Sequence, residues 1–204
     1  MPINRNQHQT RSLYLTVERG GVSTFFPILS QGFIVKTKVG CTLRDLICNR
    51  LGLSADYMEQ RLQTIFLDGK AVDDTETTVI RQGSTLALSA AMPGLAGATL
   101  RRGSAYAAMR DQITYKKHTD DECVEDGTIH LKLFNLVAED IGELFLTRGI
   151  WISGDHLRKF FLRAPEQCPA GCRSVEVDGV QMKAENLGSI DWKQAQVFLK
   201  LKVI

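Results

Sequence analysis

Residues 62–72 carry the sequence LQTIFLDGKAV, in which a strand-like run ends at a tight turn. Residues 62–67 are mainly apolar and β-branched, as in a short buried strand. Asp68-Gly69 is a dipeptide that accepts positive φ angles, so it favours a reversal of the chain. Residues 70–72 then return as a second short strand. The stretch predicts a small antiparallel hairpin within a sheet.

A helix signal precedes this hairpin. Thr42-Leu43-Arg44-Asp45 is a variant of the capping box, because the Thr42 hydroxyl can accept the backbone N–H three residues later. An apolar stripe follows at helical spacing, and Gly52 stands where a left-handed residue ends a helix. The stripe consists of Leu43, Leu46, Ile47 and Leu51. Alternating apolar residues also predict strands at 13–17, 33–39 and 84–89, and the connection between the first two has room for further strand.

The predicted order is two strands, one capped helix and two or three strands. A single helix that crosses one face of a small mixed sheet is the simplest arrangement that buries the apolar stripe of this helix. This half resembles the β-grasp of ubiquitin-like proteins. The run 65–74 is similar to the ubiquitin segment of strand, Gly-Lys turn and acidic loop, and 82–88 is similar to its last strand. The capped helix resembles that of bacterial sulfur carriers. The resemblance covers about residues 12–103 and implies a ubiquitin-like β-grasp.

The predicted organisation is a polar arm at 1–11, a β-grasp domain at 12–91, a Gly/Ala/Pro-rich connector at 92–104 and an α+β domain at 105–204. In the second half, alternation predicts strands at 129–133 and 197–203, and helical spacing predicts a helix at 138–148. Ser153-Gly154-Asp155 can cap a further helix. Asp178-Gly179 lies within a hairpin over 175–182. The expected fold class is therefore α+β.

The connector ends in Leu100-Arg101-Arg102-Gly103, which resembles the Leu-Arg-Gly-Gly ending of ubiquitin-like modifiers. The resemblance implies activation at Gly103 by an activating enzyme, and a protease would first have to remove the 101 residues that follow. A plain interdomain connector is the simpler interpretation. As a recognition segment, it offers the candidate binding residues Met92, Pro93, Gly94, Leu95, Leu100, Arg101, Arg102 and Gly103.

Catalytic signals are sparse. Cys168 and Cys172 flank a Pro-Ala-Gly loop and are candidates for a disulfide, a reactive thiol or half of a metal site. His156 follows Asp155 and is a candidate general base. No second close cysteine pair completes a zinc site, so neither a metal nor another cofactor is expected. Trp151 and Trp192 are expected in the core or at a domain interface, because no basic and aromatic residues alternate around them in the sequence.

Composition limits the partner classes. The chain has 204 residues and a net charge of +2, with 44% hydrophobic residues. Residues 1–103 carry 12 basic and 8 acidic side chains (+4), and residues 104–204 carry 13 and 15 (−2), which together give +2. A balance so close to zero predicts no nucleic-acid partner and no membrane surface. The polar N-terminus has no signal-peptide core and the five cysteines are irregularly spaced, so we expect a cytoplasmic protein.

These patterns lead to a functional hypothesis. The expected function is a non-enzymatic module that binds a protein partner through a sheet face or the segment 92–103. The alternative is the precursor of a ubiquitin-like modifier or sulfur carrier that is activated at Gly103 after proteolysis. An enzyme that uses Cys168, Cys172 and His156 ranks third.

Overall fold

A computed structural model describes residues 9–90, 94–105, 114–115, 124–163, 171–193 and 195–204. It shows an α+β protein with parallel and antiparallel strand pairs, as the sequence predicts. The chain divides into two compact units. Unit 1 combines residues 1–33 with 141–204, and unit 2 comprises residues 34–140.

Unit 2 is built around the hairpin of β3 (Thr64–Leu67) and β4 (Lys70–Ala71). Its strand order is β4-β3-β5-β6-β2, with β5 at Thr85–Ser89, β6 at Glu125–Phe134 and β2 at Phe33–Val39. β5 is antiparallel to β3 and parallel to β6. An ion pair of 2.9 Å joins Lys38 at the end of β2 to Asp126 at the start of β6.

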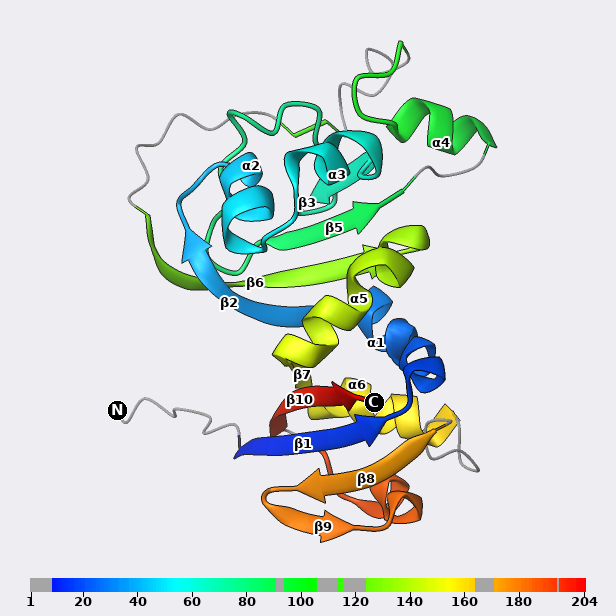
Figure 1. The fold of residues 1–204 in the computed structure, drawn as a ribbon. Helices are drawn as coiled ribbons and strands as arrows, with labels where there is room; N and C mark the ends of the chain where they lie inside the picture. The colour runs from blue at the N-terminus through cyan, green and yellow to red at the C-terminus, as the bar shows by residue number, and fades with distance from the viewer. Residues whose placement is uncertain (1–8, 91–93, 106–113, 116–123, 164–170, 194) are drawn as a thin grey trace, which may run out of the picture. The chain divides into compact units, whose positions relative to one another are not determined.

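The predicted capped helix of unit 2 is confirmed. The Thr42 hydroxyl accepts the backbone N–H of Asp45, and α2 (Leu43–Asp45) continues into a π-helical turn, η2 (Leu46–Arg50). Gly52 has a φ of +79°, as a left-handed C-terminal residue requires. α3 (Ala55–Gln60), which the sequence analysis missed, begins at Ser54 with an equivalent hydroxyl cap. The buried stripe includes Leu43, Leu46 and Ile47, and α2 lies over one face of the strands (Figure 1).

Unit 1 has the strand order β7-β10-β1-β8-β9. β10 (Ala195–Val203) is parallel to β1 (Gln9–Val17) and antiparallel to β7 (Ile150–Ser153). On the other side of β1, β8 (Cys172–Val177) is antiparallel to β1 and to β9 (Val180–Met182). The amphipathic helix α6 (Gly154–Arg163) packs on β7 and β10. Its N-terminal cap is the Ser153 hydroxyl, which accepts the His156 N–H at 3.2 Å. The predicted cap at 153–155, the hairpin at 175–182 and the last strand are therefore confirmed.

The two units share one topology and one register. Each has a hairpin (β3–β4 or β8–β9), then a parallel pair (β5–β6 or β1–β10), then one further strand (β2 or β7) that is followed in the chain by helical structure. In unit 2, Leu86 of β5 is opposite Leu67 of β3 and Leu131 of β6. In unit 1, Leu13 of β1 is opposite Val177 of β8 and Leu199 of β10 in the same way. On the other face, Ala87 is opposite Phe66 and Lys132, as Tyr14 is opposite Glu176 and Lys200. Ala87 and Lys132 in unit 2 thus correspond to Tyr14 and Lys200 in unit 1.

The arrangement of the strands differs from the predicted division into domains 12–91 and 105–204. β1 pairs with β10 and β8 in unit 1 and does not join β3, β4 and β5. The place beside β5 belongs to β6, from the second half of the chain. Local periodicity identifies strands but does not identify their partners, which depend on long-range pairing.

Four further segments of the described chain are helical. Residues 19–31, where the sequence has room for further strand, are helical and form η1 (Arg19–Phe25) and α1 (Phe26–Gln31). The predicted connector contains a short helix, α4 (Gly94–Leu100). The helix predicted at 138–148 is α5 (Leu136–Arg148), and η4 (Ala184–Ser189) precedes the last strand.

Candidate functional site

A hollow of about 440 Å³ lies on the face of unit 2 that carries Phe66, Ala87 and Phe134. These side chains come from β3, β5 and β6, and the other lining residues are Gly69, Thr85, Ser89, Lys132 and Asn135. Leu86, Leu88 and Leu131, which alternate with the lining residues along β5 and β6, are fully buried. Because successive side chains of a strand point to opposite faces, the hollow lies on the face opposite this core.

The local sequence explains why the face is hollowed. Ala87 has only a methyl group, and the partly exposed Phe66 and Phe134 are larger residues on the strands that flank β5. Asn135 takes a φ of +52° directly after β6, and its side-chain amide donates to the Ser89 hydroxyl at 3.3 Å. The lining is therefore predominantly apolar, and Lys132 is its one ionic residue. Lys132 has no ion pair with any residue that the structure describes.

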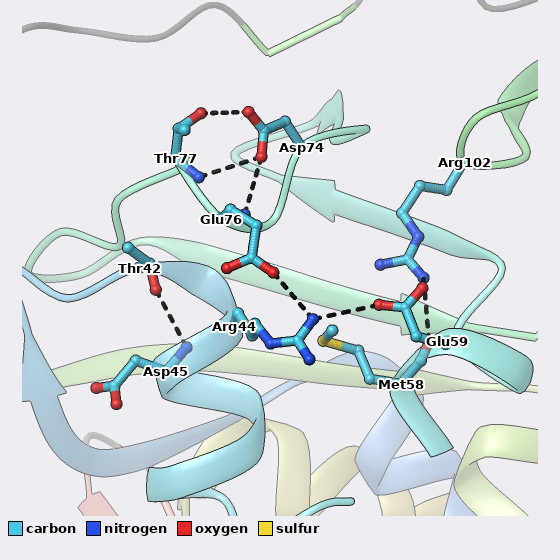
Figure 2. A network of polar contacts seen from close by, with 9 residues as sticks. All are labelled: Thr42, Arg44, Asp45, Met58, Glu59, Asp74, Glu76, Thr77 and Arg102. Atoms are coloured by element: carbon cyan, nitrogen blue, oxygen red, sulfur yellow. Dashed lines mark hydrogen bonds and ion pairs between the residues drawn. The ribbon is translucent and has the colours of Figure 1, made fainter. Parts of the chain in front are cut away.

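A second cavity in unit 2, of about 460 Å³, is polar and lies where residues 101–103 meet the body of the unit. Figure 2 shows the network of charged side chains around it. The lining residues are Glu59, Leu62, Gln63, Asp73, Asp74, Thr75, Glu76, Arg101, Arg102 and Gly103. The cavity thus combines both signs of charge with the end of the predicted connector.

Arg102 and Gly103 are bound to the body of unit 2 by main-chain and side-chain contacts. The Arg102 N–H donates to the Gln63 carbonyl at 2.8 Å, and its guanidinium donates to the Glu59 carboxylate at 2.8 Å (Figure 2). The Gly103 N–H donates to the Asp73 carboxylate at 3.1 Å. Only 11% of the Arg102 side chain is exposed. The end of the segment is therefore docked and does not extend as a free tail.

Arg44 joins the same network from α2. Its Nη1 lies 2.9 Å from a Glu76 carboxylate oxygen and 3.5 Å from one of Glu59, so Glu59 binds Arg44 and Arg102 together (Figure 2). Glu76 lies in a loop that the Asp74 carboxylate holds by accepting the backbone N–H groups of Glu76 and Thr77. The network is a set of paired charges that fastens the segment.

The thiol and carboxyl groups beside α2 show no activated nucleophile. Burial raises the pKa of the Cys41 thiol, and the nearby Asp45 carboxylate adds to this effect. Burial likewise raises the pKa of Cys48. The Asn49 side-chain amide donates to Asp45 and, together with Arg50, holds the pKa of that carboxyl below its usual value. A raised pKa keeps both thiols protonated near neutral pH, which opposes nucleophilic reactivity.

The predicted binding residues separate into three groups. Met92 and Pro93 lie outside the described residues. Gly94, Leu95 and Leu100 belong to α4, where Leu95 is 76% exposed. Arg101, Arg102 and Gly103 line the polar cavity. Three of the eight predicted binding residues therefore line a cavity, and the sequence did not indicate that acidic residues from 59 and 73–76 surround it.

The candidate catalytic residues are not shown as one site. Cys168 lies outside the described residues. Cys172 lies at the start of β8, and its thiol donates to the Ser174 carbonyl at 3.6 Å. His156 lies in the first turn of α6. Within the described ranges, no group of three or more His, Cys, Asp or Glu side chains is placed to hold a metal ion.

The apolar hollow was missed by the sequence analysis, because its three main residues come from strands that are distant in the sequence. Alternation along β5 and β6 predicts which side chains face away from the core, but only the pairing of β5 with β3 and β6 brings Phe66, Ala87 and Phe134 together.

Comparisons with protein-family models, curated proteins and solved structures found no match to this chain. No helix in the described ranges has both the length and the apolar character needed to cross a bilayer.

Proposed function

We propose that this protein is a non-enzymatic interaction module that binds a protein partner through the hollowed sheet face of unit 2. The single observation that carries the proposal is the 440 Å³ hollow over Ala87, between Phe66 and Phe134. Exposed concave apolar surfaces with a few polar groups at their edges are typical binding sites for other molecules.

The positive charge of Lys132 at the hollow indicates that the partner carries an acidic residue. Lys132 lies directly opposite Ala87 on the neighbouring strand and has no ion pair among the described residues. A ligand segment that inserts an apolar side chain over Ala87 and places a carboxylate beside it would fill the hollow and pair with Lys132. The proposed partner is therefore a protein segment with an apolar residue next to Asp or Glu.

The resemblance to ubiquitin-like β-grasp proteins belongs to this proposal. In its support, the capped helix α2 lies over a mixed sheet, and the Asp68-Gly69 turn joins β3 and β4 in a hairpin of the kind that the resemblance implies. The unit departs from the expected order, because the strand beside β5 comes from residues 125–134. We infer a rearranged β-grasp whose outer sheet face serves for protein recognition.

A selection of random peptides displayed on phage against the immobilised full-length chain tests the proposal. We expect enriched peptides that contain an apolar residue beside Asp or Glu and that lose binding to the variants Ala87→Trp, which fills the hollow, and Lys132→Glu. His130→Trp is the matched control, since His130 is exposed on β6 but does not line the hollow. Peptides that bind wild type and Ala87→Trp equally would refute the proposal.

The alternative, a carrier precursor activated at Gly103, requires a protease to cut after a residue whose neighbour, Arg102, is almost buried. The bonds of Arg102 to Glu59 and Gln63 would have to break before the segment could enter a protease or an activating enzyme. The intact mass of the protein from its native cell decides between the two functions. A single full-length species excludes the precursor, and a species that ends at Gly103 would replace the interaction module as the conclusion.

A further inference from the structure

The sheet of unit 1 carries three aromatic side chains on three neighbouring strands. Trp151 on β7 is directly opposite Phe198 on β10, and their ring centroids are 5.2 Å apart. Tyr14 on β1 meets the same Phe198 ring edge-on at 6.1 Å. Tyr14 is 40% exposed, and Phe198 and Trp151 are partly exposed. The three rings therefore form an aromatic cluster that is open to solvent.

The chain is locally shaped to hold this cluster. Leu13, Leu15, Leu199 and Leu201 alternate with the cluster residues along β1 and β10 and are buried, so the rings lie on the face opposite the core. Gly149 has a φ of +98°, and a Cβ at this position would lie 2.2 Å from the Phe198 ring. A side chain at 149 would thus displace the central ring of the cluster.

The cluster borders a shallow hollow of about 510 Å³. Its walls are the three rings, the hydroxyl-bearing residues Thr10 and Ser12, and the Arg11–Asp178 ion pair. Planar apolar surfaces beside hydroxyl and charged groups suit a ligand that combines aromatic rings with hydrogen-bonding edges.

Two lysines continue the same face. Lys200 and Lys202 follow Phe198 on β10 at intervals of two residues, so all three project to the same side of the sheet. Lys200 is directly opposite Tyr14 and Lys202 directly opposite Thr16. Both lysines are exposed, and neither has an ion pair with a residue that the structure describes. The acidic residue nearest to the cluster in the register, Glu176, accepts a hydrogen bond from Gln181 at 3.2 Å.

We propose that this face of unit 1 binds single-stranded nucleic acid. Its bases stack on Tyr14, Phe198 and Trp151, and its phosphates pair with Lys200 and Lys202. Stacking on aromatic side chains of a sheet, together with a basic track for the backbone, is how sequence-tolerant single-strand binders obtain their affinity. A duplex does not fit this mode, because its bases are already stacked on one another.

The charge beside the rings favours a nucleic acid over a protein partner here. Lys200 and Lys202, which have no ion pair with a described residue, outnumber the Glu176 carboxylate beside the rings, and the hollow itself contains the balanced Arg11–Asp178 pair. The near-zero net charge of the chain does not oppose binding, since a local group of lysines determines the field at the face. No local sequence pattern predicts the site, because its aromatic and basic residues lie on strands that are far apart in the chain.

The equivalent face of unit 2 is an internal control. It retains the lysine, as Lys132, but has Ala87 in place of Tyr14 and His130 in place of Phe198. The two faces therefore have the same strand register and different chemistry, and the nucleic-acid proposal does not depend on the function proposed for unit 2.

The test is fluorescence anisotropy of labelled ten-nucleotide oligo(U) and oligo(dT), titrated with the full-length chain at several salt concentrations. We expect saturable binding that Tyr14→Ala weakens by about 5- to 100-fold, because one stacking surface is lost. The double variant Lys200→Ala/Lys202→Ala should reduce the slope of log K against log salt by about 1.4, which corresponds to two phosphate contacts. Lys132→Ala is the matched control and should leave both quantities unchanged.

Tryptophan fluorescence supplies a second measurement that does not depend on the label. Trp192 is completely buried and donates to the Leu187 carbonyl, so quenching by the oligonucleotide should come from Trp151 and disappear in Trp151→Phe. Absence of binding at low salt would overturn the proposal, as would binding that Tyr14→Ala and the lysine variants do not change. A Tyr14-dependent self-association in sedimentation without oligonucleotide binding would assign the face to a protein contact instead.

Discussion

Asp178 accepts a hydrogen bond of 2.7 Å from the backbone N–H of Ser12, a residue 166 positions earlier in the chain. The Asp178 N–H donates to the Ser12 carbonyl at 3.1 Å, and the same carboxylate accepts Nε of Arg11 at 2.8 Å. Asp68 and Thr85 repeat this pattern in unit 2, with a side-chain bond of 2.7 Å and a main-chain bond of 2.9 Å. In each unit, the aspartate of an Asp-Gly turn thus binds the backbone of the neighbouring strand, at Ser12 within β1 and at Thr85, the first residue of β5.

Removal of this carboxylate should destabilise unit 1. Asp178→Ala loses the bonds from Ser12 and Arg11 and places alanine at a φ of +51°, which aspartate tolerates better. We expect the free energy of unfolding to fall by about 2 to 3 kcal/mol, measured by urea denaturation followed by circular dichroism. Asp56→Ala, at an exposed helix position, is the control and should change it by less than about 1 kcal/mol.

The same residue predicts a pH dependence. Although partial burial opposes ionisation, the bonds from Ser12 and Arg11 hold the pKa of Asp178 below its usual value. A lowered pKa in the folded state adds stability at a pH above the pKa of the unfolded chain, and this stability disappears as the pH falls through the folded pKa. Asp178→Asn should therefore be less stable than wild type at pH 6, and the difference should shrink below about pH 4. A constant difference in urea midpoint from pH 6 to pH 2.5 would contradict this.

Gly154 should tolerate no side chain. A Cβ at this position would lie 1.7 Å from the Trp192 carbonyl oxygen, which is backbone and has little freedom to move. Gly154→Ala should reduce the free energy of unfolding by about 3 kcal/mol, because α6 must separate from the segment that carries Trp192. Gly188→Ala is the matched control, since a Cβ there meets no atom within 4 Å. Equal melting temperatures for the two variants would show that the close approach is not a constraint.

Most local elements of this chain follow from sequence, whereas the strand partners do not. Thr42, Gly52 and the Asp-Gly turns act within a few residues, so their chemistry predicts the cap, the helix end and the hairpins. Tyr14 and Lys200 are neighbours only because β1 pairs with β10, from the opposite end of the chain. No local pattern identifies the partner of β1, since the apolar side chains of β1 could be buried equally well beside any strand that has one buried face.

The candidate sites follow the same rule. The segment ending at Gly103 is a candidate site because its contiguous residues resemble a Leu-Arg-Gly-Gly ending, and its last three residues line a cavity. The Phe66–Ala87–Phe134 hollow and the aromatic cluster each draw on three strands, so they become visible only after the sheet is assembled. Trp192 matches its predicted core position, but Trp151 is partly exposed, because its partner Phe198 occupies the outer face of β10.

The docking of residues 101–103 leads to a last prediction. Glu59→Gln removes the charge that binds the Arg102 guanidinium and should weaken the contact by about 1 kcal/mol, so the detached population should rise about 5-fold. Limited trypsin digestion with mass spectrometry should show a matching increase in cleavage after Arg102, because trypsin cuts the detached segment. Glu76→Gln removes a carboxylate that binds Arg44 in the same network but has no described contact with Arg102, so its cleavage rate should match wild type. Equal rates for both variants would mean that the main-chain bond from Arg102 to Gln63 holds the segment without the ion pair.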